Sequence, residues 1–516
     1  MAALEAFSCC IVSPLFLFLF SFLLLSSFYT PSRCGLLVFI LILNCIQHLL
    51  VSSEFSSVQK RSVCFSVWRE KYTSATKAIQ PSIHSSTHQH KMGELQPDTC
   101  PLTSLRYIAQ SYNHADSQAS ALRLVLTLNP HWEGPGNNIE FVRFTDGITN
   151  TLLKIINRKP GLTDEQIDNE AVLMRAYGNH TEILIDRERE MRSHALLASH
   201  GLAPPLLARF QNGLLYRFIR GRPATNQDLV KAPTWRGVAR RLGQWHAVLP
   251  IHNAVKSPVS TTDSAVQPVD ATSTGHQPTD EAEFSPIQPR QPGPNMWTVL
   301  QKWVLALPSA TEEQRSRRLQ LQKELERAVS ELDDGKGLGE NGLVFAHCDL
   351  LCANVITLPS SDGTATSSED EAATVQFIDY EYATPSPAAF DIANHFAEWA
   401  GYDCDFNMMP TRAVRRQFLT EYVNSYTHFK GLPESSQKAI VDQLFDDVDR
   451  FRGIPGLYWG VWALIQAQIS QIDFDYASYA DLRLSEYYAW RREQDGSRAQ
   501  AGEEMPLRER RWAQEA

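Results

Sequence analysis

The order of three polar residues around two short apolar runs is the feature that most constrains this chain. Asp349 lies in a turn, Asn354 lies five residues later just before the apolar pair 355–356, and Asp379 ends a second apolar run at 375–378. Pairing of the two runs as a β-hairpin would return Asp379 to the neighbourhood of Asp349 and Asn354. Amide and carboxylate oxygens suit Mg²⁺, and a carboxylate beside an acceptor hydroxyl suits phosphoryl transfer. The pattern therefore predicts a phosphotransferase-type site that holds magnesium-ATP.

The composition fits a globular chain with a small-molecule substrate. The chain has 516 residues, of which 43% are hydrophobic and 21% charged, enough for two to four units of roughly 150 residues each. Its formal net charge of −10 argues against nucleic acid as a partner, because a phosphate backbone requires a basic face.

Residues 1–91 differ in composition from the rest of the chain. They hold three acids against seven Lys and Arg, a balance of +4, which leaves −14 for the remainder. Two apolar runs, 11–28 and 35–51, are each about long enough to cross a bilayer, which takes roughly 17 to 25 residues as a helix. A membrane hairpin, a targeting segment and a translated leader before Met92 all stay open. Membrane contact is expected only if residues 11–51 belong to the working protein.

Cysteine usage favours a reducing compartment. Five of the nine cysteines lie within residues 1–91, and the remaining four, Cys100, Cys348, Cys352 and Cys404, are spread over the rest of the chain. Cys348 and Cys352 have the spacing of neither a metal site nor a redox pair. We expect buried or incidental thiols in a cytoplasmic protein, with membrane anchoring through the N-terminal segment as the alternative.

A β-hairpin and a strand-helix pair are predicted after Met92. Residues 139–144 alternate as a strand, 145–150 form a turn and 151–156 return as an apolar strand. The glycine at the tip, Gly147, is a candidate phosphate cover, although such a glycine is also ordinary in a turn.

The strand 171–178 contains one basic residue, Arg175, and the helix that follows the run 183–186 contains Glu190. These two residues are candidates for the cation-carboxylate pair that orients ATP phosphates in kinase folds. The alternative is a solvated arginine and a surface glutamate. A strand at 214–219 then leads to 220–223, a predicted hinge between two lobes.

The second lobe is predicted to start with a helix at 235–248. Ser, Thr, Pro, Gln and Asp dominate residues 255–294, which we interpret as a disordered insertion because they cannot bury enough apolar surface. A similar loop at 360–373 joins the two strands of the predicted hairpin. Residues 499–516 form a charged tail.

Several blocks of the sequence resemble the choline/ethanolamine kinase family. They are Val344-Phe345-Ala346-His347-Cys348-Asp349-Leu350-Leu351-Cys352-Ala353-Asn354, Ile378-Asp379-Tyr380-Glu381-Tyr382 and the run 390–399, while 144–150, 177–182 and 186–188 resemble its ethanolamine kinase branch. The resemblance runs from about Ile139 to Tyr488, apart from the two loops. It implies an α+β, two-lobed, protein-kinase-like fold of the choline kinase and aminoglycoside phosphotransferase type. A small β-rich, ATP-binding lobe would occupy residues 92–220, and a larger helical lobe residues 221–498.

The resemblance also implies roles for individual residues. Asp349 would accept or orient the proton of the acceptor alcohol, and Asn354 and Asp379 would complete the catalytic set and hold Mg²⁺. ATP would be bound by Gly147, Thr149, Asn150, Arg175 and Glu190. Arginine stands at 175 where protein kinases keep lysine, and its planar fork can grip phosphate oxygens in pairs. His347 and Asp391 are expected to brace the catalytic turn.

The acceptor pocket implied by the resemblance contains Asp349, Tyr382, Glu398, Trp459, Trp462 and Tyr479. A small amino alcohol needs a carboxylate and aromatic faces near its ammonium. Trp459 and Trp462 lie three apart on one face of the helix predicted within 457–469. Two tryptophans at that spacing are also ordinary core residues.

Ethanolamine is the predicted acceptor. Asp403 occupies a position where choline kinases tend to offer another aromatic, which favours a primary amine, whereas Trp459-Gly460-Val461-Trp462 is closer to the choline branch. The expected reaction is ATP-dependent phosphorylation of ethanolamine to phosphoethanolamine, the first step toward phosphatidylethanolamine. A choline or dual-specificity kinase, a non-catalytic kinase-like scaffold and a membrane-anchored protein are the alternatives, and a homodimer stays open.

Overall fold

The computed structural model describes residues 105–144, 150–178, 183–251, 287–291, 293–359, 371–470 and 472–516. All of them belong to one of the two compact units of the chain, Pro97–Ala516. The segment 1–91, Gly147, Thr149 and the residues 360–370 of the predicted loop lie outside the described residues. Across the described ranges, no helix is long and apolar enough to cross a membrane.

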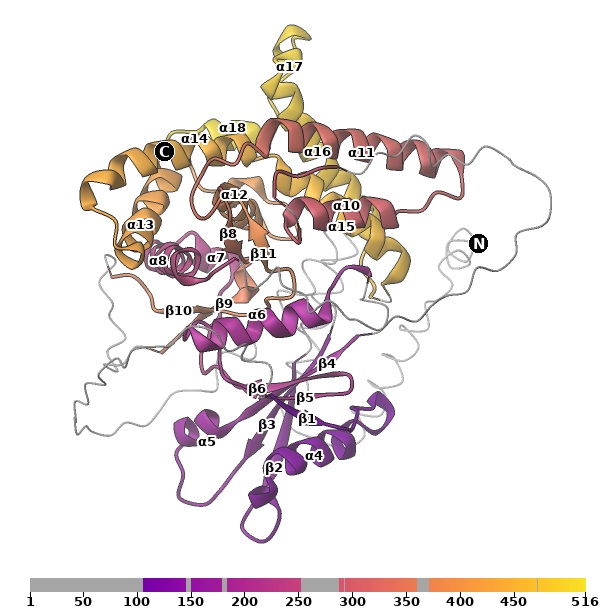
Figure 1. Cartoon of the computed structure of the whole chain (residues 1–516), viewed down its shortest axis with the longest axis vertical. Coiled ribbons are helices and arrows are strands. Elements are labelled where there is room, and N and C mark those ends of the chain that lie inside the picture. Colours follow the sequence, from indigo (N-terminus) through magenta and orange to yellow (C-terminus); the bar gives the residue numbers. More distant parts are fainter. Residues whose placement is uncertain are drawn as a thin grey trace, which may run out of the picture. The chain divides into compact units, whose positions relative to one another are not determined.

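A six-stranded sheet forms the first lobe, with strand order β1-β5-β6-β4-β3-β2 (Figure 1). Its members are β1 (Arg106–Ile108), β2 (Ile139–Phe144), β3 (Asn150–Asn157), β4 (Val172–Tyr177), β5 (Leu206–Phe210) and β6 (Gly213–Arg217), accompanied by α4 (Ser117–Leu128), α5 (Asp164–Glu170) and α6 (Arg187–Ser199). All neighbouring strands are antiparallel except β1 and β5. Leu124 and Val125 of α4 are fully buried in the core cluster that this sheet forms.

Local sequence explains the elements that carry the candidate site residues in this lobe. In the β2–β3 hairpin Phe144 pairs with Leu152, so Asn150 begins the returning strand. Strand β4 sets Arg175 opposite Leu152 in the middle of the sheet. Asp186 caps α6 by accepting from the backbone N–H of Arg189 at 3.0 Å, which fixes the start of the helix that carries Glu190.

The second lobe is mainly helical. Its helices are α7 (Asn226–Leu229), α8 (Ala232–Val248), α10 (Met296–Ala306), α11 (Glu312–Leu332), α12 (Ala388–Glu398), α13 (Arg412–Lys430), α14 (Gln437–Phe451), α15 (Ile454–Ile469), α16 (Tyr476–Gln494), α17 (Ser497–Gln500) and α18 (Leu507–Ala513). Two small antiparallel sheets lie among them: β7 (Arg222–Pro223), β9 (Val355–Thr357) and β10 (Val375–Phe377) form one, and β8 (Val344–Ala346) and β11 (Thr384–Ser386) the other. The predicted α+β arrangement, a small β-rich lobe followed by a larger helical one, is confirmed.

The end of the predicted insertion and the charged tail both make hydrogen bonds with the helical lobe, while residues 255–286 of that insertion lie outside the described residues. At the end of the predicted insertion, the backbone N–H of Ile287 donates to Gln301 at 3.0 Å. Near the C-terminus, the carbonyl of Gln514 accepts from the N–H of Arg412 at 2.8 Å, at the start of α13 where helix N–H groups lack partners within the helix. Trp512 of the charged tail is only 4% exposed. The tail therefore packs as part of the helical lobe.

Candidate active site

The β9–β10 hairpin brings the predicted metal-binding and catalytic residues together. Phe377 pairs with Val355, and the N–H of Ile378 donates to the carbonyl of Asn354 at 3.0 Å. The amide nitrogen of Asn354 donates to the backbone carbonyl of Asp349 at 2.8 Å and to its carboxylate at 3.2 Å. Asp379 follows the paired strand directly, so the ladder itself sets the spacing of these side chains.

Asp391 holds the turn in front of Asp349. Its two carboxylate oxygens accept from the backbone N–H groups of His347 at 2.9 Å and Cys348 at 2.7 Å. A third bond, 3.0 Å long, joins it to Nε2 of His246. Asp391 is fully buried at 0% exposed, and donors on three sides compensate its charge. The turn is thus fixed by a side chain from the first turn of α12.

The ring of His347 supports the same turn. Its Nδ1 lies 3.3 Å from the backbone N–H of Asp349 and accepts from it, so Nε2 carries the proton and donates to the carbonyl of Ile378 at 3.0 Å. Burial lowers the pKa of His347, which keeps the ring neutral. His347 therefore joins the turn that carries Asp349 to the strand that leads to Asp379, a bracing geometry.

Two non-glycine residues of the site have left-handed backbone conformations. Cys348 has φ of 64° and Asp379 has φ of 67°. Such conformations are strained for L-residues and persist only where surrounding contacts over-determine them. For Cys348 those contacts include Asp391 and the side chain of Asn394, which donates to the Cys348 carbonyl at 2.9 Å.

Asp349 lies in a strongly negative field. Burial raises the pKa of its carboxyl well above the usual range, and the neighbouring charges of Asp379, Glu398 and Glu381 raise it further. These carboxylates come from both the hairpin and α12. Asp349 is therefore electrostatically linked to the predicted metal ligands and to the predicted ammonium-binding residue, and a cation bound among them would favour its charged form.

Arg175 crosses from the first lobe to the hairpin. Its guanidinium lies 3.2 Å from Glu190 and 2.9 Å from Asp379, and it also donates to Glu381. Burial disfavours its charge, but Asp379, Glu190 and Glu381 raise the pKa of Arg175 above its ordinary value. The pair predicted with Glu190 is present in the geometry, together with two carboxylates that were not predicted as its partners.

Glu381 is the residue of this cluster that the sequence-based site omitted. Asn150 donates to it at 3.1 Å, and Arg187 lies 3.6 Å from the same oxygen. Burial and the charge of Asp379 raise the pKa of Glu381 to about 7, although Arg175 opposes them. The available signal was its spacing, since Glu381 lies two residues after Asp379 beyond the end of a strand.

The described residues hold no group of three or more His, Cys, Asp or Glu side chains arranged as a metal site. Mg²⁺ in phosphotransferases commonly uses one or two carboxylates and takes its remaining ligands from phosphate and water. Asp379 and the amide oxygen of Asn354 fit such a set, because the amide nitrogen of Asn354 already donates to Asp349. Glu381 adds another carboxylate beside them.

Trp459 and Trp462 of α15 have indole N–H groups that are already hydrogen-bonded. Trp459 donates to Asn394 at 2.8 Å and Trp462 donates to the hydroxyl of Tyr382 at 2.8 Å. The two indole rings meet edge to face, with their centroids 5.5 Å apart. The ring of Tyr382 meets that of Trp459 in the same way, with the centroids 5.8 Å apart. Fixed rings of this kind suit the binding of an organic cation.

Glu398, at the end of α12, is tied to α16. Its Oε1 accepts from Arg483 at 3.3 Å, and the guanidinium of Arg483 lies 5.8 Å from the ring of Tyr479. Burial raises the pKa of Glu398, while Arg483 lowers it. The structure thus groups Glu398 and Tyr479 around one arginine that the sequence did not single out.

Two further aromatics adjoin Tyr479. Tyr402 lies 6.2 Å from it and Phe474 lies 5.6 Å from it, measured between ring centroids. Asp403, whose presence in place of an aromatic residue was expected to favour a primary amine, is exposed. Tyr402 supplies an aromatic from the neighbouring position. Its adjacency in sequence to Asp403 was the only signal that could have suggested it.

Comparison with known proteins shows which family this chain resembles. The model of the choline/ethanolamine kinase family matches residues 141–488. Ethanolamine kinase 1 from Mus musculus is 32% identical over 76% of this chain and 94% of its own length, and ethanolamine kinase 1 from Homo sapiens is 32% identical over 76% of each. The structure of Plasmodium vivax ethanolamine kinase aligns with a TM-score of 0.51 at 23% identity over 73% of this chain and 89% of its own, which supports the fold. The chain belongs to the choline/ethanolamine kinase family.

Proposed function

We propose that this kinase transfers the γ-phosphate of ATP to the hydroxyl of ethanolamine and releases phosphoethanolamine. The observation that carries the proposal is the environment of Asp349, which is bonded by Asn354 and electrostatically linked to both Asp379 and Glu398. An ethanolamine molecule with its hydroxyl at Asp349 and its amine toward Glu398 would present that hydroxyl to the nucleotide. The ethanolamine kinases of mouse and human, similar over three quarters of this chain, support this substrate.

Asp349 is the proposed contact of the acceptor hydroxyl. Its raised pKa makes it a better proton acceptor than an ordinary aspartate, and the bonds from Asn354 fix its orientation. Asp391 and His347 hold the turn so that the carboxylate meets the hydroxyl in line with the transferred group. Most of the rate enhancement is then positioning and charge neutralisation.

Arg175 is the proposed contact of the ATP phosphates, with Glu190 bracing it. Its planar fork can bind two phosphate oxygens at once. Asn150 is proposed at the same side of the site, where it already contacts Glu381, and Gly147 and Thr149 are proposed to cover the phosphates.

Magnesium is proposed to bind Asn354 and Asp379. When bound, Mg²⁺ neutralises the charge that develops on the phosphates. Asp379 and Glu381 currently face Arg175, so their negative charge is compensated from within the chain. We expect these carboxylates to exchange part of that contact for the metal when magnesium-ATP binds.

Glu398, Trp459, Trp462, Tyr382 and Tyr479 are the proposed ammonium-binding side of the pocket. A carboxylate can accept hydrogen bonds from the N–H groups of a primary ammonium, whereas a quaternary ammonium has no N–H group to donate. Aromatic faces serve both cations. Choline therefore remains the second candidate acceptor, favoured by the two tryptophans and the additional rings of Tyr402 and Phe474.

A coupled assay of ADP release tests the proposal. Purified protein is offered ethanolamine, choline and an aminoglycoside at equal concentrations, with and without Mg²⁺. We expect the highest kcat/KM with ethanolamine and dependence on Mg²⁺. A higher kcat/KM for choline would replace the substrate, and turnover of the aminoglycoside alone would refute the proposed pocket.

The wider setting of this activity is also proposed. Phosphoethanolamine is expected to feed phosphatidylethanolamine synthesis through CDP-ethanolamine, in the cytoplasm. The domain limits predicted from the sequence, 92–220, 221–498 and 499–516, and the role of residues 1–91 stay predictions, as does a homodimer. Expression from Met92 followed by the same assay tests whether the N-terminal segment contributes to activity.

A further inference from the structure

A line of alternating charges leads from the acceptor pocket to the C-terminal helix α18. Arg483 lies 3.3 Å from Glu398 and 3.7 Å from Glu486. Arg508 of α18 lies 3.3 Å from the second oxygen of Glu486 and 3.0 Å from Glu509. The most exposed of the five, Glu398, is only 6% exposed. Because solvent screens buried charges little, each member influences the next.

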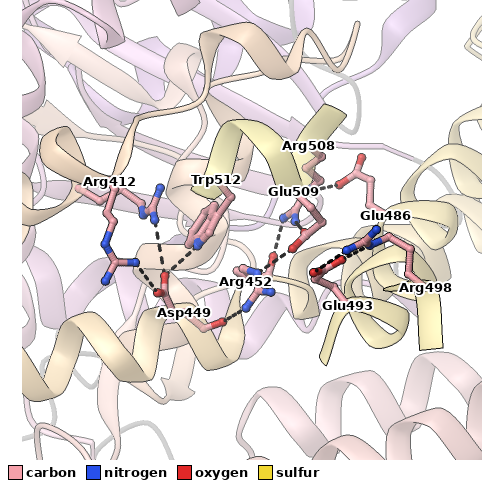
Figure 2. A network of polar contacts seen from close by, with 10 residues as sticks. Arg412, Asp449, Arg452, Glu486, Glu493, Arg498, Arg508, Glu509 and Trp512 are labelled. Carbon is pink, nitrogen blue, oxygen red and sulfur yellow. Dashed lines mark hydrogen bonds and ion pairs between the residues drawn. The ribbon is translucent and has the colours of Figure 1, made fainter. Parts of the chain in front are cut away.

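Helix α18 is anchored to the lobe by contacts of its own. Figure 2 shows Glu509 directed at Arg452, a pair 2.9 Å apart, and the indole of Trp512 donating to Asp449 at 2.7 Å. The same view shows Arg508 directed at Glu486 of α16. The tail therefore presents a fixed cation to α16, the helix that also carries Arg483.

Arg483 forms ion pairs with two carboxylates, Glu398 and Glu486. The balance between these two ion pairs sets how strongly the charged form of Glu398 is favoured. Burial raises the pKa of Glu398, Arg483 lowers it and the charge of Glu486 raises it. Arg508 compensates part of the charge on Glu486. Without Arg508, Glu486 would attract Arg483 more strongly, and Glu398 would lose the cation that favours its charged form and bonds its Oε1.

We propose that Glu486 and Arg508 are positioning residues for the acceptor, which act through Arg483 to keep Glu398 charged and oriented toward the ammonium. The C-terminal helix thereby sets the affinity for the amino alcohol without touching it. This inference rests on the proposed function of Glu398 as the ammonium-binding residue.

The other titratable groups that face Glu398 cannot shift its titration in the tail variants. Burial raises the pKa of Cys404 to about 12, and burial likewise raises the pKa of Tyr479 above its ordinary range, so both are neutral. Tyr402 is a phenol and is also neutral near pH 7. Asp349 interacts electrostatically with Glu398, and the tail variants leave the turn that carries Asp349 unchanged.

The test compares Arg508→Met, Glu486→Gln, the double variant and the control Arg510→Ala. Arg510 lies on α18 too, but it is exposed and forms an ion pair with Glu504, at 2.7 Å. Ethanolamine binding is measured by calorimetry against pH with a non-hydrolysable ATP analogue, together with KM, kcat and Tm. For Arg508→Met we expect the acid limb of binding to move up by about one pH unit, which raises KM for ethanolamine up to about tenfold at pH values on the acid side of that limb.

Glu486→Gln should move the acid limb in the opposite direction, because it removes the charge that raises the pKa of Glu398 and leaves Arg483 to Glu398. The double variant should return toward the wild type, and Arg508→Lys should largely rescue Arg508→Met. KM for ATP should stay unchanged in all of them, as should every property of Arg510→Ala except a small change in Tm.

Opposite shifts support the proposal, and a merely structural tail would not produce them. Unshifted acid limbs, or shifts in the same direction for both single variants, would overturn it. If Arg508→Met does not fold, the shift in Glu486→Gln decides. Wild-type protein that fails to phosphorylate ethanolamine would instead refute the proposed function, so the two failures are distinguishable.

Discussion

Replacing Asp391 by asparagine tests how much of the activity depends on the fixed turn before Asp349. The carboxylate accepts three bonds of 2.7 to 3.0 Å from His347, Cys348 and His246. An amide keeps one acceptor oxygen and turns an NH₂ group toward the remaining donor. Because Oδ2 accepts two of these bonds, an amide oxygen placed there gives up only the bond from Cys348. A hydrogen bond to a charged group contributes about 1.5 to 3 kcal/mol, so we expect stability to decrease by about 2 kcal/mol.

The effect on turnover should exceed what a stability loss alone produces. Cys348 holds φ of 64° against the preference of its side chain, and the lost bond restrains that residue. Relaxation of the turn by a fraction of an ångström would misplace Asp349, for which we expect kcat to fall on the order of 100-fold. KM for ATP should change little.

Denaturant unfolding and steady-state kinetics on Asp391→Asn measure both quantities, and Asp449→Asn is the matched control. Asp449 also accepts a bond from a buried donor, the indole of Trp512, at 2.7 Å, but in the tail network. The control should lose stability and keep its kcat. An Asp391→Asn variant that loses stability yet retains wild-type kcat would refute the role assigned to the turn.

Three further predictions concern the site itself. Asp349→Ala should lower kcat about a thousandfold while ATP binding, measured by calorimetry, stays close to wild type; retained turnover would remove the catalytic assignment. The pKa of Glu381 is raised from 4.5 to about 7, so the folded state holds a proton that the unfolded state releases, and stability should fall as pH rises through that window. Glu381→Gln should flatten this dependence in thermal melts, and an unchanged slope would contradict it. Trp462→Phe loses the bond to Tyr382 but keeps an aromatic face, so KM for ethanolamine should rise far less than in Trp462→Ala; equal increases would argue against a cation-π contact.

Local patterns made part of this fold predictable. The alternation at 139–144 and the turn after it predicted the β2–β3 hairpin, and the apolar runs around Asn354 and Asp379 predicted β9 and β10. These elements depend on neighbours in sequence, so periodicity and turn chemistry are sufficient to find them. The proximity of Asp349, Asn354 and Asp379 was predictable for the same reason, since one hairpin brings them together.

Contacts between distant segments were not predictable in this way. Arg175 was paired with Glu190 alone, whereas it also contacts Asp379 and Glu381 of the second lobe. The packing of the two lobes decides such partners, and nothing in the spacing of either segment indicates it. Glu381 was consequently not predicted as a site residue, although it lies in the run 378–382 that resembles the family.

The C-terminal residues illustrate a second limit. Residues 499–516 were predicted only as a charged tail, and isolated charges are rarely buried. In the structure Arg508 and Glu509 are each 3% exposed, since each meets an opposite charge on another helix. Hydropathy is assigned to each residue separately, so it cannot indicate that two distant charged residues form an ion pair and can be buried together.

The pairing of β9 with β10 has a practical consequence for engineering. The ladder from Thr357↔Val375 to Val355↔Phe377 fixes the hairpin next to Asn354, at the end opposite the connection between the strands. Lengthening a connection of this kind costs only about 0.6 kcal/mol for each doubling of its length. The segment between the strands is therefore a suitable insertion point for an affinity tag or a fluorescent reporter, which would lie on the same hairpin as the proposed magnesium ligands without displacing them.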